Sequence, residues 1–171
     1  NTAANGISAS SSSGLVVNQL SVTTTTGTAV TLANSSGALS FTRVSANGAA
    51  NGIVINDFGG SFEITGDGST AGSGGTIQNA IGNAVELINT GNVALNFLNI
   101  ANGNANGVFG QNLTGLTLNG ASLSNNGNGV NEGGLRFDPN LLGTVLIANS
   151  TITGSAERNI EIINISGVLS D

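Results

Sequence analysis

Residues 30–34 read Val-Thr-Leu-Ala-Asn, and residues 53–57 read Ile-Val-Ile-Asn-Asp. In both stretches the first and third residues are apolar, and the fifth is a short polar residue. Apolar residues at every second position predict a strand that buries one face. The two stretches begin 23 residues apart, and a strand that recurs at such an interval predicts a solenoid of stacked coils.

The apolar residue that begins each copy, here called the anchor, recurs along the whole chain. Successive anchors are 23, 23, 32, 23, 27 and 25 residues apart. Because each anchor begins one coil, the spacing predicts about seven coils. The anchors are Ile7, Val30, Ile53, Val85, Val108, Leu135 and Ile160.

A second apolar pattern follows the anchors, and it consists of two pairs of alternating apolar residues. The two-residue gap between the pairs predicts a bend between two short strands, so each coil is expected to hold three short strands and three corners. Further copies occupy residues 93–100, 116–123 and, more weakly, 145–152. The first copy, Leu15, Val17, Leu20 and Val22, aligns with the second, Leu39, Phe41, Val44 and Ala46.

A short polar residue stands four positions past the anchor, except after Leu135, where Pro139 takes that place. Asn and Asp tolerate a left-handed backbone and bond neighbouring backbone groups, so they suit a corner. In a stack, their side chains can also bond the same residue one coil away. We therefore predict a structural corner ladder of Asn34, Asp57, Asn89, Asn112 and Asn164.

These patterns predict an all-β fold, a parallel β-helix of three short strands per coil. No segment keeps a helical period, and Gly, Asn, Ser and Thr disfavour helix interiors. Parallel crossovers are nearly always right-handed, so a right-handed winding is expected. Two stretches do not fit the repeat, Gly66–Gly75 and Asn125–Gly133, and both are expected to be loops that leave the stack.

Composition excludes several classes of function. The 171 residues carry a net charge of -6, and only 7% are charged. This balance argues against nucleic acid, which needs clustered Lys and Arg, and no apolar run is long enough to insert into a membrane. The chain has no Cys and no His, so thiolate and imidazole metal sites are excluded. It begins at Asn1, and we expect residues 1–171 to be a single domain excised from a longer repetitive protein.

Phrases such as Asn106-Gly107-Val108 and residues 149–152, Asn-Ser-Thr-Ile, resemble right-handed parallel β-helix repeats. The chain resembles most the repeat regions of large bacterial surface proteins and autotransporter-type passengers. That resemblance implies secretion, an extracellular or cell-surface location, a long parent protein and an adhesive or scaffold role. The same fold family includes pectin-degrading lyases and hydrolases and phage tailspikes.

The candidate binding residues are few. Glu63, at an outward strand position, and Asp67, in the nearby loop, are the carboxylates that a glycosidase mechanism would need to pair. Phe109 is an outward aromatic that would stack on a sugar. We expect solvated or structural roles for all three, and no catalytic residue, cofactor or metal. Arg136 and Glu161 occupy equivalent outward positions on adjacent coils, which predicts an ion pair.

A row of polar residues is also expected on the outer face of the third strand, where it would suit ice or a glycan. Its members are Ser21, Ser45, Thr76, Asn99, Ser122 and Thr151.

Three functions remain open at this point. The first is a structural module, a rigid stalk, adhesin shaft or filament-forming scaffold, with open ends that stack on further copies of itself. The second is a glycan- or ice-binding module that uses an outward face, with surface glycans as partners. The third is a carbohydrate-active enzyme that uses Glu63 and Asp67.

Overall fold

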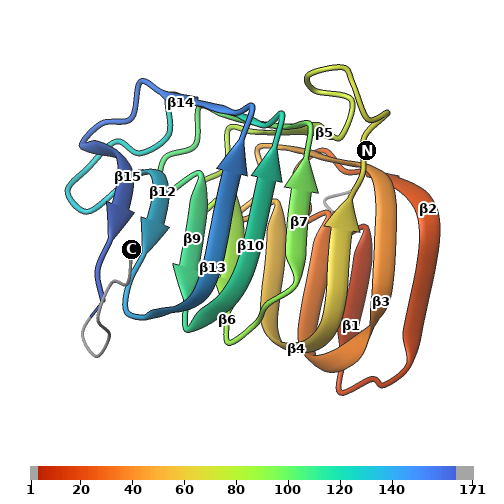
Figure 1. Ribbon diagram of the computed structural model, residues 1–171. Coiled ribbons are helices and arrows are strands. Elements are labelled where there is room, and N and C mark those ends of the chain that lie inside the picture. Colours follow the sequence, from red (N-terminus) through yellow and green to blue (C-terminus); the bar gives the residue numbers. More distant parts are fainter. Residues whose placement is uncertain (1–3, 165–171) are drawn as a thin grey trace.

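The structure is a computed structural model that describes residues 4–164. The described chain is all-β and contains no helix, and its fifteen strands form one continuous parallel arrangement (Figure 1). The strands are β1 (Ile7–Ser10), β2 (Leu15–Thr23), β3 (Val30–Asn47), β4 (Ile53–Ile64), β5 (Gly75–Gln78), β6 (Val85–Ile88), β7 (Val93–Asn96), β8 (Leu98–Ala101), β9 (Val108–Gln111), β10 (Leu113–Asn119), β11 (Ser122–Ser124), β12 (Gly133–Phe137), β13 (Leu141–Ala148), β14 (Thr151–Thr153) and β15 (Arg158–Ile162).

The strands stack into three faces around a common axis. The first face holds β1, the beginnings of β3 and β4, then β6, β9, β12 and β15; the second holds β2, the middle of β3, the end of β4, then β7, β10 and β13; the third holds the ends of β2 and β3, then β5, β8, β11 and β14. In Figure 1, β7, β10 and β13 run upwards at the front while the coils advance from right to left, which is a right-handed winding. The predicted fold, a parallel β-helix of about seven turns, is confirmed.

All seven anchors lie in one column on the first face, as predicted. The pairs are Ile7 with Val30, Val30 with Ile53, Ile53 with Val85, Val85 with Val108, Val108 with Leu135, and Leu135 with Ile160. The anchors stay in register across the intervals of 32 and 27 residues because the additional residues form loops outside the stack. These loops separate β4 from β5 and β11 from β12, where the sequence predicted them.

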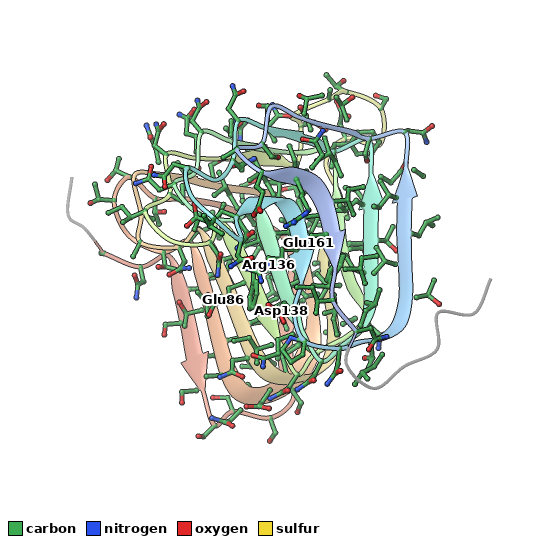
Figure 2. The ribbon with its side chains drawn as sticks, turned by 90° about the vertical axis from the view of Figure 1, so that its left-hand side faces the viewer. Glu86, Arg136, Asp138 and Glu161 are labelled. Carbon is green, nitrogen blue, oxygen red and sulfur yellow. The ribbon has the colours of Figure 1, made fainter. Side chains whose placement is uncertain are left out.

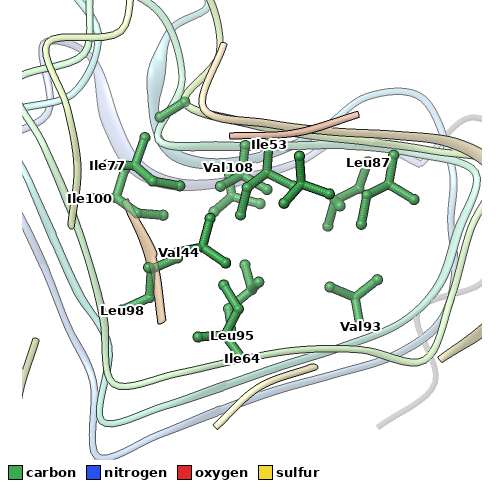
Figure 3. Close-up of a cluster of buried hydrophobic side chains, with 14 of the residues drawn as sticks. Val44, Ile53, Ile64, Ile77, Leu87, Val93, Leu95, Leu98, Ile100 and Val108 are labelled. Carbon is green, nitrogen blue, oxygen red and sulfur yellow. The ribbon is translucent and has the colours of Figure 1, made fainter. Parts of the chain in front are cut away.

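The inward side chains fill the space between the three faces (Figure 3). Each column is apolar along its length, so every coil packs on the same kind of residue above and below it. Ile53, Leu87 and Ile100 are fully buried, and burial of such a side chain contributes roughly 1.5–3 kcal/mol. The ring centroids of Phe41 and Phe62, on adjacent coils, are 5.3 Å apart. The core therefore runs through the stack without interruption in its central coils.

The first coil corrects the predicted alignment of the second pattern. Val17, not Leu15, pairs with Leu39, and Leu15 lies two positions earlier, beside Gly37. Three residues of β2 then face two of β3, because Gln19 adopts a left-handed backbone with φ 54° and forms a bulge. The same two-residue difference in alignment also corrects the hydroxyl row.

Ser21 pairs with Arg43, and Thr23 takes its predicted place beside Ser45. Ser45 is itself buried, and its Oγ accepts hydrogen bonds from the Thr76 backbone N–H and the Arg43 side chain. Only Thr76, Asn99, Ser122 and Thr151 remain in register as an outward row.

Candidate functional site

The corner after the first face carries a ladder of side-chain hydrogen bonds. Asn89 donates to Asp57 Oδ1 at 2.9 Å, Asn112 donates to Asn89 Oδ1 at 2.8 Å, and Asn140 donates to Asn112 Oδ1 at 3.2 Å. These residues have a left-handed backbone, as does Asn34, with φ between 47° and 65°. An amide can donate to one coil and accept from the other, whereas the ionised Asp57 only accepts. The donors therefore all point towards the N-terminal end of the stack.

Three members of the ladder differ from the sequence prediction. Asn34 has the left-handed backbone of a corner, but within residues 4–164 its side chain forms no hydrogen bond to another corner residue. In the Leu135 coil, the corner position passes to Asn140, which has the left-handed backbone of a corner and stands one residue later than in the other coils. Asn164 donates to the Leu141 carbonyl oxygen at 3.3 Å, one residue past Asn140, and so bonds the backbone rather than another corner side chain.

The sequence analysis missed further asparagine ladders at the other corners. After the third face, Asn79 donates to Asn47 at 2.8 Å and Asn125 donates to Asn102 at 3.4 Å. After the second face, Asn149 donates to Asn119 at 3.0 Å. A signal was present for the first of these ladders, because Asn79, Asn102 and Asn125 each stand two residues past the inward apolar residue of the third strand.

The outer side of the second face is hollowed into a groove of about 810 Å³. The backbone of the strand centres forms its floor, and two rows of outward side chains form its walls. One wall contains Val16, Ala38, Ser61, Asn92, Gly115 and Thr144, and the other contains Asn18, Ser40, Glu63, Ala94, Thr117 and Leu146. The groove runs along the axis of the stack because each wall takes one residue from each of six coils. At about 4.8 Å per coil, six coils span roughly 24 Å.

Among residues 4–164, Glu63 is the only ionisable residue that lines this groove. Its Oε1 accepts a hydrogen bond from the Asn96 side chain at 3.3 Å. Asp67 does not line the groove. Its carboxylate accepts from the backbone N–H groups of Ser69 at 2.9 Å and Thr70 at 2.7 Å.

Hydrogen bonds from Thr70 and Ser69 hold the pKa of Asp67 well below its usual range, because they stabilise the charged form. The two carboxylates that the sequence offered as a pair therefore have different partners and different surroundings. Asp67 organises its own loop, and Glu63 belongs to the groove.

The outer side of the first face carries a charged network near the C-terminal end (Figure 2). Arg136 Nε lies 3.0 Å from Glu161 Oε2, which confirms the predicted ion pair, and Arg136 also binds Asp138 at 2.5 Å. Arg158 binds Glu161 at 2.5 Å and Glu157 at 3.2 Å. Phe109 lies in the same column, in register with Glu86 and Arg136. It is half-buried there rather than presented as a flat aromatic platform.

Residues 4–164 contain no group of three or more Asp or Glu side chains placed to hold a metal ion. Over the same range, no helix is long and apolar enough to cross a membrane.

The fold and its ladders place the chain in the class of parallel β-solenoids. Comparison with known proteins adds no narrower assignment: no family model matches the chain, and no curated protein or solved structure matches it significantly.

Proposed function

We propose that this chain is a structural, non-catalytic β-helix module, a rigid shaft or scaffold segment. The observation that carries the proposal is the continuity of the stack. Anchor residues and second-strand residues connect one coil to the next along the described chain, and corner side chains add hydrogen bonds from Asp57 to Asn140. Neighbour contacts of this kind make stability and stiffness a property of the array rather than of one site.

The placement of the charged groups supports a structural role. Asp57 ends a corner ladder, Asp67 ties its own loop, and Glu161 joins two arginines. Glu132 binds two backbone N–H groups of the second loop. A general acid or base must be free to reach a substrate, and these carboxylates are already engaged within the fold.

The setting of such a module is also a proposal. The resemblance of the repeats to bacterial surface and autotransporter-type proteins favours an extracellular or cell-surface shaft in a longer parent. The low content of charged (7%) and aromatic (4%) residues in the whole chain is compatible with a role in spacing rather than in recognition.

Polysaccharide cleavage tests the non-catalytic part of the proposal. The chain and its Glu63→Gln variant would be incubated with a panel of neutral, acidic and amino polysaccharides, and reducing ends and chain length would be measured. We expect no cleavage by either protein. Cleavage by the native chain that disappears in Glu63→Gln would contradict the proposal, because Glu63 would then be a catalytic group.

The groove favours a second candidate function, the binding of an extended glycan along the second face. Hydroxyl and amide groups occupy half of the wall positions, and the spacing between coils, about 4.8 Å, is close to the length of a sugar unit in an extended chain. With Glu63 as its one charge, the groove suits neutral or amino-sugar chains and disfavours polyanions.

A glycan array followed by Ala94→Trp would test this candidate. The bulky side chain would fill the groove without touching the core, because Ala94 points outward between Glu63 and Thr117. Val54→Trp, on the outer side of the first face, is the matched control. Binding that Ala94→Trp abolishes and Val54→Trp preserves would support the groove, whereas equal loss in both variants would exclude it.

A further inference from the structure

The chain contains eight Asn-Gly pairs. In this dipeptide the asparagine deamidates most readily, because glycine has no side chain to hinder its own backbone nitrogen. A shaft with eight such pairs carries a chemical weakness unless the fold restrains them. The pairs are Asn5-Gly6, Asn47-Gly48, Asn51-Gly52, Asn102-Gly103, Asn106-Gly107, Asn119-Gly120, Asn126-Gly127 and Asn128-Gly129.

Deamidation requires the glycine nitrogen to attack the Cγ of the preceding asparagine. The nitrogen gives up its proton to solvent, the N–Cγ bond forms, and the Cγ–Nδ2 bond breaks to release ammonia. Water then opens the resulting succinimide to aspartate or isoaspartate. A glycine N–H that is held in a hydrogen bond must first lose that bond before its nitrogen can react.

In this structure every one of the eight glycine N–H groups donates a hydrogen bond. Seven of them donate to a neighbouring coil, so the stack itself restrains them. Six acceptors are backbone carbonyls and one is a buried side chain. The bonds are Gly6 to Thr28 O, Gly48 to Gln78 O, Gly52 to Ala84 O, Gly107 to Gly133 O, Gly120 to Ala148 O, Gly127 to Gly103 O, and Gly103 to Asn126 Oδ1, with lengths of 2.8–3.1 Å.

The eighth pair, Asn128-Gly129, is restrained differently. It lies in the loop between β11 and β12, and both residues are exposed. Glu132, in the same loop, accepts the N–H of Asn128 at 2.8 Å and that of Gly129 at 2.7 Å through one carboxylate oxygen. This restraint depends on a single side chain, with no coil stacked on it.

We propose that Asn128 is the site at which the folded protein deamidates, and that Glu132 restrains the reaction there. A carboxylate is too weak a base to remove an amide proton. Its negative charge also opposes formation of the anionic nitrogen. Glu132 therefore slows the attack by holding the N–H, and the other seven pairs react only when the coils separate.

Deamidation of Asn128 adds a negative charge to this loop, where charged side chains already lie close together. Asn131, three residues further on, donates its backbone N–H to Glu157 at 2.6 Å. Conversion of Asn128 adds a carboxylate beside Glu132, and the like charges weaken the bonds that close the loop. The reaction thus modifies an exposed insertion while the stack beneath it stays intact.

Peptide mapping by mass spectrometry tests this inference on the full chain. Native protein would be incubated in mildly alkaline buffer, and deamidation at each Asn-Gly pair would be followed with time. We expect Asn128 to react first, with the seven stacked pairs slower by about tenfold or more, because opening an exposed loop costs less free energy than separating stacked coils. In the thermally unfolded chain, all eight should react at similar rates.

Glu132→Ala is the decisive variant. It should accelerate Asn128 by about tenfold, from the loss of that one hydrogen-bonded carboxylate, and leave the seven stacked pairs unchanged. Those seven pairs also report whether the variant still folds, because they would all accelerate in an unfolded chain. Reaction of Asn128 no faster than the stacked pairs in native protein, or slower reaction in Glu132→Ala, would overturn the proposal.

Discussion

The side-chain amide of Asn112 donates a hydrogen bond of 2.8 Å to the side-chain oxygen of Asn89, its counterpart one coil earlier. Asn89 in turn donates to Asp57, so Asn89 accepts a hydrogen bond from one coil and donates a hydrogen bond to the other. Both asparagines adopt a left-handed backbone that most residues avoid. The corner is therefore a place where one residue type satisfies the backbone conformation and the stacking contact together.

Replacement of Asn89 separates these two contributions. Asn89→Ala removes both side-chain bonds and places a Cβ-bearing residue in the left-handed region, and we expect a loss of about 2 kcal/mol. Asn89→Gly removes the same bonds, but glycine adopts the left-handed backbone without strain. We therefore expect Asn89→Gly to lose only about half as much stability as Asn89→Ala. Chemical denaturation followed by circular dichroism measures both. An equal loss in the two variants would show that backbone conformation contributes nothing at this corner.

The Asp67 loop should respond to pH in a defined direction. The folded pKa of Asp67 is lowered, so its stabilising contribution is present above the unfolded value of about 4 and is lost only as pH falls through the lower folded value. We expect the Ser69 and Thr70 amides to stay protected from hydrogen exchange at pH values just below 4. In Asp67→Ala they should exchange quickly at neutral pH. Loss of protection in the native chain at the pKa of an ordinary aspartate would contradict this.

The ion pair of Arg136 with Glu161 is suited to a double-mutant cycle. Both side chains are mostly withdrawn from solvent, at 14% and 15% exposed. We expect a coupling of about 1 kcal/mol between Arg136→Ala and Glu161→Ala, above that of a fully exposed pair because screening is reduced. Arg136 with Glu86, two coils apart along the same column, is the control and should show little coupling. Equal coupling in both cycles would show that the coupling comes from the overall charge distribution and not from direct contact between Arg136 and Glu161.

The edge strands of the stack lead to a prediction about self-association. Within residues 4–164, β1 pairs only with β3 and β15 only with β12, and Ile160 and Ile162 are 46% and 42% exposed. We propose that these edges pair with a second copy, head to tail, because all strands run parallel and the apolar columns would continue. Sedimentation velocity should show mass rising with concentration.

Ile160→Lys should reduce that association, because a charge would replace an apolar contact at the edge. Val54→Lys carries the same charge change on the side of the stack and is the control. Association that is absent in the native chain, or unaffected by Ile160→Lys, would exclude stacking through this edge.

The periodic parts of the fold were predictable from the sequence because burial is periodic. The column from Ile7 to Ile160 could be traced across both loops, since each anchor must meet another apolar residue above and below it. The first coil could not be aligned, because Leu15 and Val17 are both apolar and the bulge at Gln19 depends on a backbone conformation that the pattern does not encode.

The candidate site was predictable only in part. Glu63 was identified as an outward residue. The groove that it lines is formed by residues from six coils together, so it cannot be recognised in any single copy of the repeat. Asn140 was missed because the corner of the Leu135 coil stands one residue further past its anchor than the other corners do. The restraint on Asn128 depends on Glu132, four residues away in an irregular loop, where no repeat guides the alignment.

The most direct test of the structural account is the deletion of one whole coil. Removing residues 85–107 joins Ala84 to Val108. The residues that then become neighbours on adjacent coils are Val108 and Ile53, Leu116 and Phe62, and Leu123 and Ile77. Each inward column therefore remains apolar. Removing residues 85–95 instead deletes β6 and most of β7 but leaves β8, so the coil is left incomplete, and this variant is the control.

If the chain is a shaft of interchangeable coils, the variant that lacks residues 85–107 will fold with a single thermal transition. Small-angle X-ray scattering will then show it shorter by about 4.8 Å, the spacing of one coil. Failure of this variant to fold, or folding with no change in length, would contradict the account.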